Sequence, residues 1–164
     1  MKILVTDDLD HRRLESFAGP GLEIVDHPGL EGEALRREIA DCTGLVAGSR
    51  TRVDEELLAA APELRIIGRA GSSVDSIDVA AASRRGVLVM NTPGANANAA
   101  AEHAIAMLCA LTRNLAPADA AMKAGRFEPD AYTGVELRER LLAVLGLGPV
   151  GRLVPENAQG PGGR

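Results

Sequence analysis

Short apolar runs alternate with helical stretches through the first ninety residues of the chain. Five runs have the length of strands, and we predict strands at residues 3–5, 22–25, 44–47, 64–68 and 87–90. Between these runs apolar residues recur at helical spacing, as at Leu35 and Ile39, which are four positions apart and would share one helix face. This alternation indicates βαβ units and a parallel sheet, so we expect a flavodoxin-like, doubly wound α/β fold.

Helices are expected between these strands, at residues 9–17, 31–39, 53–61 and 75–85. The pattern changes after Pro93, because residues 98–115 are rich in Ala and nearly free of helix breakers, and Asn96 or Asn98 can cap a long helix there. A short helix, a polar connection and a last strand should follow, at residues 117–125, 126–134 and 141–145. We therefore expect one domain over residues 1–97 and the beginning of a second over residues 98–152.

Three glycines follow the last predicted strand in the spacing G-x-G-x-x-G, at Gly146, Gly148 and Gly151. Between a strand and a helix, this spacing is typical of a turn that lets the backbone approach the pyrophosphate of a dinucleotide. Here only residues 152–154 separate the third glycine from Pro155, and a segment rich in Pro and Gly follows. We therefore expect no helix after the turn and a disordered tail over residues 153–164.

The composition favours a helix-rich core of Leu, Ile, Val and Ala, because 46% of the residues are hydrophobic but only 2% are aromatic. A net charge of -5 argues against a nucleic-acid or membrane-surface protein, which normally needs a basic face. We see no bilayer-spanning run and no signal peptide, and we expect a cytoplasmic protein. Cys42 and Cys109 have no ligand-spaced partners, so we expect two buried thiols and no metal site.

In an open α/β sheet, ligands bind beyond the carboxyl ends of the strands. The loops after the third, fourth and fifth predicted strands are polar, and they comprise residues 48–52, 69–73 and 91–96. They offer guanidinium, hydroxyl, amide and backbone N–H groups, which suit a carboxylate or a phosphate. Any one of Arg50, Arg52 and Arg69 would ordinarily be a solvated surface charge, but three polar loops at one edge indicate an anion site.

Four stretches resemble, in order and spacing, the N-terminal half of the D-2-hydroxyacid dehydrogenases, most closely the branch that acts on 3-phosphoglycerate: residues 69–78, 86–93, 101–103 and 146–151. The resemblance implies an NAD-dependent oxidoreductase that acts on the CH–OH group of a small anionic hydroxyacid. It also implies a homo-oligomer, most of whose interface we expect these 164 residues to lack. For this branch the reaction would convert 3-phosphoglycerate to 3-phosphohydroxypyruvate, in serine biosynthesis. Residues 1–97 would form most of the substrate domain, and the long helix would cross into an incomplete Rossmann domain.

The resemblance also implies two sets of binding residues. Those expected to contact substrate are Ser49, Arg50, Arg69, Ala70, Gly71 and Asn96. Those expected to contact NAD are Ser72, Gly146, Gly148, Pro149, Val150 and Gly151. The departures from the family pattern are Gly48 in place of a common Arg, Ser73 in place of Gly, Ser76 in place of Asn, and Pro149 in place of a basic residue.

The catalytic Arg, acidic residue and His of the family match no position of this chain. We therefore expect no catalytic residue among these 164 residues and no turnover by the chain alone. His103, near the start of the long helix, is expected to be a packed or rim residue rather than an acid or base.

Two other functions stay open. The substrate domain could be a non-catalytic module that binds anions. Asp7 and Asp8, directly after the first strand, also resemble the acidic pair that holds Mg²⁺ in receiver-like signalling domains. The third strand, however, ends in Gly48 and Ser49 instead of an Asp, and no Lys follows the fifth. For Asp7 and Asp8 we expect a solvated strand end.

Overall fold

The computed structural model describes residues 1–9, 16 and 19–159. The chain divides into two compact units, Met1–Ala95 and Asn96–Arg164, which we call the N-terminal and C-terminal units. Most of the helix predicted at residues 9–17, and residues 160–164 of the predicted tail, lie outside the described residues.

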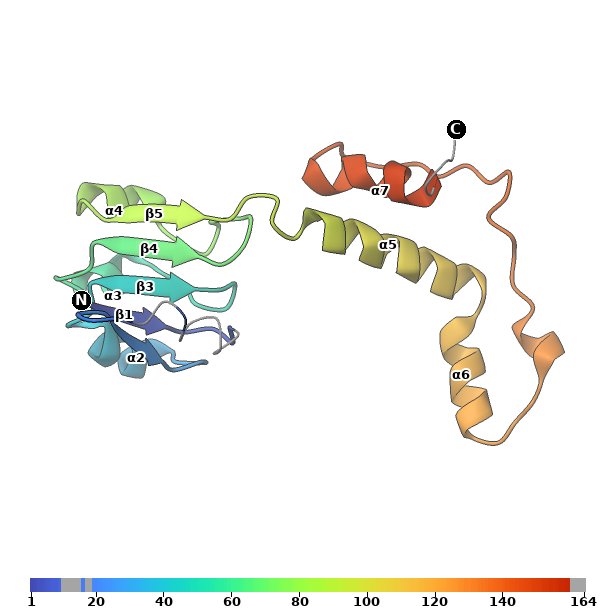
Figure 1. Cartoon of the computed structure of the whole chain (residues 1–164), viewed down its shortest axis with the longest axis horizontal. Coiled ribbons are helices and arrows are strands. Elements are labelled where there is room, and N and C mark those ends of the chain that lie inside the picture. The colour runs from blue at the N-terminus through green and yellow to red at the C-terminus, as the bar shows by residue number, and fades with distance from the viewer. Residues whose placement is uncertain (10–15, 17–18, 160–164) are drawn as a thin grey trace. The chain divides into compact units, whose positions relative to one another are not determined.

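A parallel sheet of five strands forms the centre of the N-terminal unit, in the order β2-β1-β3-β4-β5. The strands are β1 (Lys2–Val5), β2 (Glu23–Asp26), β3 (Gly44–Ala47), β4 (Ile66–Arg69) and β5 (Leu88–Asn91). Every neighbouring pair is parallel, so all five carboxyl ends meet at one edge of the sheet (Figure 1). This strand order is that of the flavodoxin-like fold, which confirms the predicted fold class.

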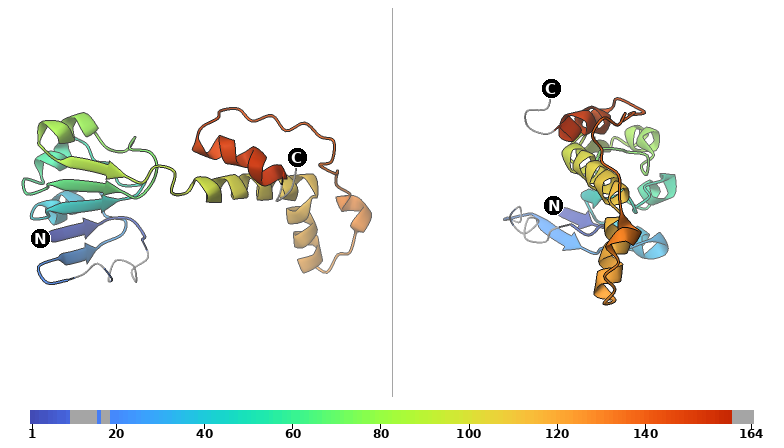
Figure 2. Two further views of the ribbon diagram at one scale, coloured as in Figure 1. Left: turned by 45° about the horizontal axis from the view of Figure 1, so that its top comes forward. Right: turned by 90° about the vertical axis from the view of Figure 1, so that its right-hand side faces the viewer.

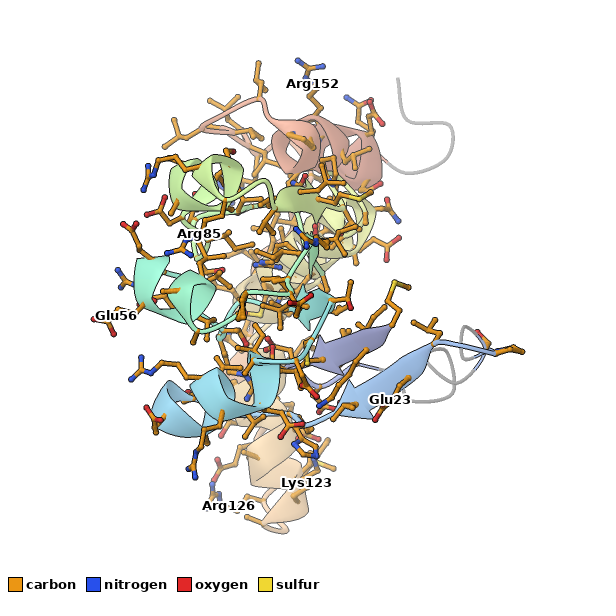
Figure 3. The ribbon with its side chains drawn as sticks, turned by 90° about the vertical axis from the view of Figure 1, so that its left-hand side faces the viewer. Glu23, Glu56, Arg85, Lys123, Arg126 and Arg152 are labelled. Carbon is orange, nitrogen blue, oxygen red and sulfur yellow. The ribbon has the colours of Figure 1, made fainter. Side chains whose placement is uncertain are left out.

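Three helices cover one face of this sheet (Figure 3): α2 (Gly32–Ile39), α3 (Glu55–Ala59) and α4 (Val79–Arg84). Beneath them, Leu4, Leu45 and Ile67 lie side by side on β1, β3 and β4, and each is at most 1% exposed. Leu35 and Ile39 of α2 are buried against the same cluster, as their spacing predicted. The core is aliphatic, and each such side chain contributes roughly 1.5–3 kcal/mol through burial.

Helices α3 and α4 begin at adjoining caps. The side chain of Asp54 accepts a hydrogen bond from the Leu57 N–H, and that of Asp78 accepts one from the Ala81 N–H. Val53 links the two starts, because its N–H donates to the Ser76 carbonyl and its carbonyl accepts from the Asp78 N–H, both at 2.8 Å. These links hold the connections that follow β3 and β4 next to each other.

The C-terminal unit is helical and comprises α5 (Ala97–Thr112), α6 (Leu115–Lys123), the 3₁₀ turn η1 (Pro129–Tyr132) and α7 (Pro149–Gln159). Helix α7 lies along α5 (Figures 1 and 2). The fully buried hydrophobic residues of this unit are alanines, Ala97, Ala101 and Ala121, whereas Leu111 and Phe127 are each 77% exposed. The described part of this unit therefore has little core of its own.

The predicted strand at residues 141–145 is wrong. This segment belongs to no strand in the described part of the chain, and Leu141 and Leu145 are 96% and 98% exposed. A strand needs a neighbour to accept and donate its backbone hydrogen bonds, and the C-terminal unit contains no described strand that could do so.

The predictions of no helix after the glycine turn and of disorder from residue 153 are also wrong, because α7 extends from Pro149 to Gln159. Pro149 is the first helical residue, where its fixed φ suits the helix and its missing N–H is not needed. Pro155 lies inside the helix and removes one internal hydrogen bond. Packing along α5, with Leu153 and Val154 half-buried, offsets that loss.

No helix among the described residues is both long enough and apolar enough to cross a bilayer.

Candidate functional site

The carboxyl edge of the sheet contains a point where the strand order reverses, between β1 and its neighbour β3. In open α/β sheets, the crevice beyond such a point is the usual place for a ligand. Thr6 and Asp7 follow β1 here, and residues 48–51 follow β3. We call residues 48–51 the β3 loop.

Asp7 connects these two strand ends. One carboxylate oxygen, Oδ2, accepts hydrogen bonds from the Gly48 N–H at 2.5 Å and from the Thr51 hydroxyl at 3.0 Å. The other, Oδ1, lies 3.4 Å from Nε of Arg50. The Thr51 and Thr6 hydroxyls are 2.7 Å apart. Asp7, Thr6 and Thr51 are at most 7% exposed, so this network is shielded from water.

The surroundings of Asp7 favour its ionised form. Burial by itself would raise the pKa of Asp7, but the Gly48 N–H, the Thr51 hydroxyl and the Arg50 guanidinium hold that pKa below its ordinary value of 3.8. The expectation that Asp7 is a solvated strand end is therefore wrong, although its neighbour Asp8 is indeed exposed. The sequence pattern placed the anion site only in the loops after the third, fourth and fifth strands, and Asp7 was considered only as a possible Mg²⁺ ligand.

Gly48 has a steric reason to be glycine. A Cβ added there would lie 2.4 Å from Cγ of Asp7, closer than any real contact. In this chain the Asp7 carboxylate occupies the space beside the Gly48 backbone. The guanidinium of this loop comes instead from Arg50, whose side chain is 68% exposed.

The loops after β4 and β5 are joined to each other. The Ser72 hydroxyl accepts from the Gly94 N–H at 3.2 Å, and the Ser72 carbonyl accepts from Nδ2 of Asn91 at 2.8 Å. The Gly71 carbonyl accepts from the Thr92 N–H. The Ala70 N–H donates to the Ala47 carbonyl, which ties this pair of loops to β3. The three predicted loops therefore share one sheet edge, as expected.

Arg69 does not extend from this edge. Its Nη1 donates to the carbonyl of the following residue, Ala70, and its Nε is buried without a hydrogen-bond partner. Gly71 makes this position possible, because a Cβ there would meet Nη1 and because its φ of +154° is one that side chains disfavour. Of the three arginines predicted for the anion site, Arg50 and Arg52 are exposed, whereas Arg69 is half-buried.

A hollow of about 450 Å³ adjoins the β3 loop. Its lining is mostly polar: Ser49, Arg50, Arg52, Val53, Asp54, Asp75, Ser76, Ile77 and Asp78. Ser76 Oγ is buried there without a hydrogen-bond partner, so the wall of the hollow contains an unused donor and acceptor. The two arginines and the hydroxyls of the lining could bind a small oxyanion, and of the three carboxylates beside them, those of Asp54 and Asp78 already accept hydrogen bonds from helix N–H groups.

Asn96, Cys109 and His103 belong to the C-terminal unit, whereas Cys42 belongs to the N-terminal unit. Asn96 is exposed and directly precedes α5, but its side chain makes no capping hydrogen bond. Cys109 is half-buried and Cys42 fully buried, and both are free, so the expectation of two buried thiols holds for Cys42 alone. Burial raises the pKa of Cys42 to about 11. His103 is exposed on α5 rather than packed.

The glycine turn is followed by a helix, α7, but no strand precedes it in the described part of the chain. Gly146 has a φ of +96°, and a Cβ at Gly151 would lie 2.0 Å from the Gly146 carbonyl oxygen, so only glycine fits. Arg152 closes the turn, with its N–H donating to the Gly148 carbonyl and its Nε to the Leu147 carbonyl. The first N–H groups of an α-helix have no internal acceptor and favour a negative charge. The turn therefore fits a pyrophosphate, with Pro149 supplying no N–H.

No group of three or more His, Cys, Asp or Glu side chains in the described part of the chain is arranged to hold a metal ion.

Comparison with known proteins identifies relatives over almost the full chain. The family model for the catalytic domain of D-isomer specific 2-hydroxyacid dehydrogenases matches residues 3–146. D-3-phosphoglycerate dehydrogenase of Sus scrofa is 41% identical over 158 residues, which are 96% of this chain and 30% of the relative. The chain thus spans about a third of the length of the curated relatives that it matches.

Solved structures agree with this comparison. The TT0316 protein of Thermus thermophilus has a TM-score of 0.89 at 30% identity, over 96% of this chain and 52% of that one. The NAD⁺-bound 3-phosphoglycerate dehydrogenase of Entamoeba histolytica has a TM-score of 0.76 at 31% identity, over 98% and 51%.

Proposed function

Because the chain belongs to the D-isomer specific 2-hydroxyacid dehydrogenase family, we propose that its carboxyl sheet edge binds the anionic end of a D-2-hydroxyacid and its glycine turn binds NAD. The β3 loop provides the main support for the substrate site. Arg50 is solvent-exposed there, beside a polar hollow and at the point where the strand order reverses. A guanidinium offers a planar set of donors that matches a carboxylate or a phosphate.

We propose 3-phosphoglycerate as the substrate. The name of the Sus scrofa relative supports this choice, as do the two arginines that line the hollow, Arg50 and Arg52. Gly48 supplies no charge, so this site relies on those two residues for the phosphate. An unphosphorylated hydroxyacid is the competing substrate, and it would need only one of them.

NAD would accept the hydride from C2 of the hydroxyacid when bound. The role of this chain would be to hold the cofactor. The backbone of four residues would lie against the pyrophosphate: Gly146, Gly148, Val150 and Gly151. The NAD⁺-bound Entamoeba histolytica relative supports NAD as the cofactor. We also propose Ser72 and Asn96 as contacts to cofactor and substrate, respectively, on the family resemblance.

Calorimetric titration of the 164-residue chain with 3-phosphoglycerate, and separately with glycerate, tests the substrate proposal. We expect phosphoglycerate to bind more tightly, and Arg50→Ala to weaken its binding about tenfold, because a hydrogen bond to a charged group is lost. Arg65→Ala is the matched control, since Arg65 is exposed and precedes β4 at the opposite edge of the sheet. Absence of binding, or equal losses in the two variants, would contradict the proposal.

A second candidate is a binding module without turnover, which the lack of any family catalytic residue at a matching position supports. With NADH and 3-phosphohydroxypyruvate, we expect this chain alone to show no substrate-dependent loss of nicotinamide absorbance. Measurable turnover would exclude this candidate and leave the substrate proposal standing.

A further inference from the structure

We propose that Asp7 is a positioning residue for the β3 loop, setting the orientation of the Gly48 backbone and of the Arg50 guanidinium toward the ligand. This inference rests on the proposed function in one respect, namely that Arg50 meets the substrate anion. The placement of the loop by Asp7 is a separate matter that can be tested without a ligand.

The position of Asp7 in the sheet makes it suitable for this role. Asp7 is the second residue after β1. Because β1 and β3 are neighbouring strands, the Asp7 carboxylate lies next to Gly48, the first residue after β3. The Thr6 N–H donates to the Val46 carbonyl at 3.1 Å and fixes the backbone just before Asp7. The sheet therefore fixes the position of Asp7, and the conformation of the β3 loop depends on its hydrogen bonds to the Asp7 carboxylate.

Three donors of the β3 loop converge on this single carboxylate. They are a backbone N–H, a hydroxyl and a guanidinium, from Gly48, Thr51 and Arg50. Because Asp7 and Thr51 are buried, removal of the acceptor would leave donors unpaired in a shielded place. The loop would then have to rearrange to satisfy them.

The contact with Arg50 leaves that residue able to bind a ligand. The contact with Asp7 uses Nε, and the side chain is 68% exposed, so the two terminal nitrogens of the guanidinium are left available to a ligand. A pairing through the terminal nitrogens would instead have used the donors that a carboxylate or phosphate needs. Asp7 thus orients the arginine without occupying its binding face.

The first test follows the Gly48 amide by NMR. In the unchanged chain we expect this N–H to exchange slowly and its shift to respond to acid, since it donates to Asp7. Asp7→Asn keeps the side-chain volume but replaces one carboxylate oxygen with an NH₂ group, which cannot accept a hydrogen bond from the donors of the β3 loop. We therefore expect hydrogen exchange of the Gly48 amide to accelerate at least about tenfold. Asp8→Asn, at the exposed neighbour, removes the same charge and should leave Gly48 unchanged. Equal Gly48 exchange in the two variants would overturn the proposal.

The second test is a double-substitution cycle on 3-phosphoglycerate affinity. If Asp7 acts through Arg50, Asp7→Asn should weaken binding about tenfold in the unchanged chain and have little effect in the Arg50→Ala background. A general loss of structure would weaken both alike, which would overturn a positioning role. Should Asp7→Asn fail to fold, Thr51→Val takes its place, because it removes a hydroxyl that donates to the same carboxylate.

The two tests separate this inference from the proposed function. Absence of phosphoglycerate binding by the unchanged chain would remove the proposed substrate, while the Gly48 amide would still decide whether Asp7 places the loop. Normal binding with an Arg50-independent effect of Asp7→Asn would keep the substrate and reject the positioning role.

Discussion

Two glycines make close approaches: a Cβ at Gly151 would meet a backbone oxygen, and one at Gly48 would meet the Asp7 side chain. Gly48 brings its N–H to the Asp7 carboxylate, and Gly151 lies against the Gly146 carbonyl. The motif spacing predicted Gly151, whose role depends on residues five positions away or fewer. The contact of Gly48 with Asp7 was not predicted, because the two residues are 41 positions apart and the sequence does not show that they meet.

Asp7 should stabilise the fold only while it is ionised. Its pKa in the folded chain is below the ordinary 3.8, so its contribution is complete above that pH and is lost as the pH falls through the lowered value. Asp7→Asn should therefore lower the thermal midpoint of unfolding markedly at about pH 6 and less at about pH 2.5. Asp8→Asn serves as the control. A pH-independent effect of Asp7→Asn would contradict this assignment.

Gly151→Ala should disrupt the turn before α7. The added Cβ would lie 2.0 Å from a backbone oxygen, which cannot rotate away as a side chain can. We expect a loss of about 1–3 kcal/mol in the stability of the C-terminal unit, visible as faster amide exchange over residues 152–159. Gly148→Ala, where no atom lies within 4 Å, should change little. Similar losses in the two variants would show that the turn is not packed as described.

At the scale of elements, local patterns predicted the strands and most helices of the N-terminal unit, to within a few residues at each end. They failed over residues 141–159, where the apolar run is not a strand and the segment around Pro155 is a helix. Both failures have one cause. Whether a β-prone run pairs, and whether a helix tolerates an internal proline, depends on the neighbours available to it.

We expect the segment over residues 141–145 to promote non-specific association of the chain. Leu141 and Leu145 are almost fully exposed, and its backbone pairs with no strand in the described residues. We expect the intact chain to bind an apolar fluorescent dye and to associate in light scattering, and replacement of both leucines by Ser to reduce both signals. Glu136→Ser, at an exposed polar position of the same connection, is the control. A monodisperse, dye-negative chain would contradict the prediction.

At the scale of the molecule, the two units differ in how they are stabilised. The N-terminal unit has a continuous aliphatic core with Leu4, Leu45 and Ile67 at its centre, whereas the C-terminal unit fully buries little besides alanine. Except for Asn96, the candidate substrate residues belong to the better stabilised unit.

Residues 1–95 should fold alone. Their core is internal to them, so we expect cooperative unfolding in denaturant, and Leu45→Ala should reduce the free energy of unfolding by about 2–5 kcal/mol. Leu88→Ala is the control, because Leu88 is 57% exposed. A gradual, non-cooperative transition for residues 1–95 would show that this unit depends on the rest of the chain.

The sequence by itself determined the family, the alternation of strands and helices, and the glycine turn, because each is a pattern of near neighbours. Only the tertiary structure decided that Asp7 is buried against Gly48, that Arg69 folds back while Arg50 is exposed, and that α7 exists. These features depend on which distant segments meet and on what space they leave for a side chain. Such contacts are properties of the packed chain and are not encoded in any short stretch of it.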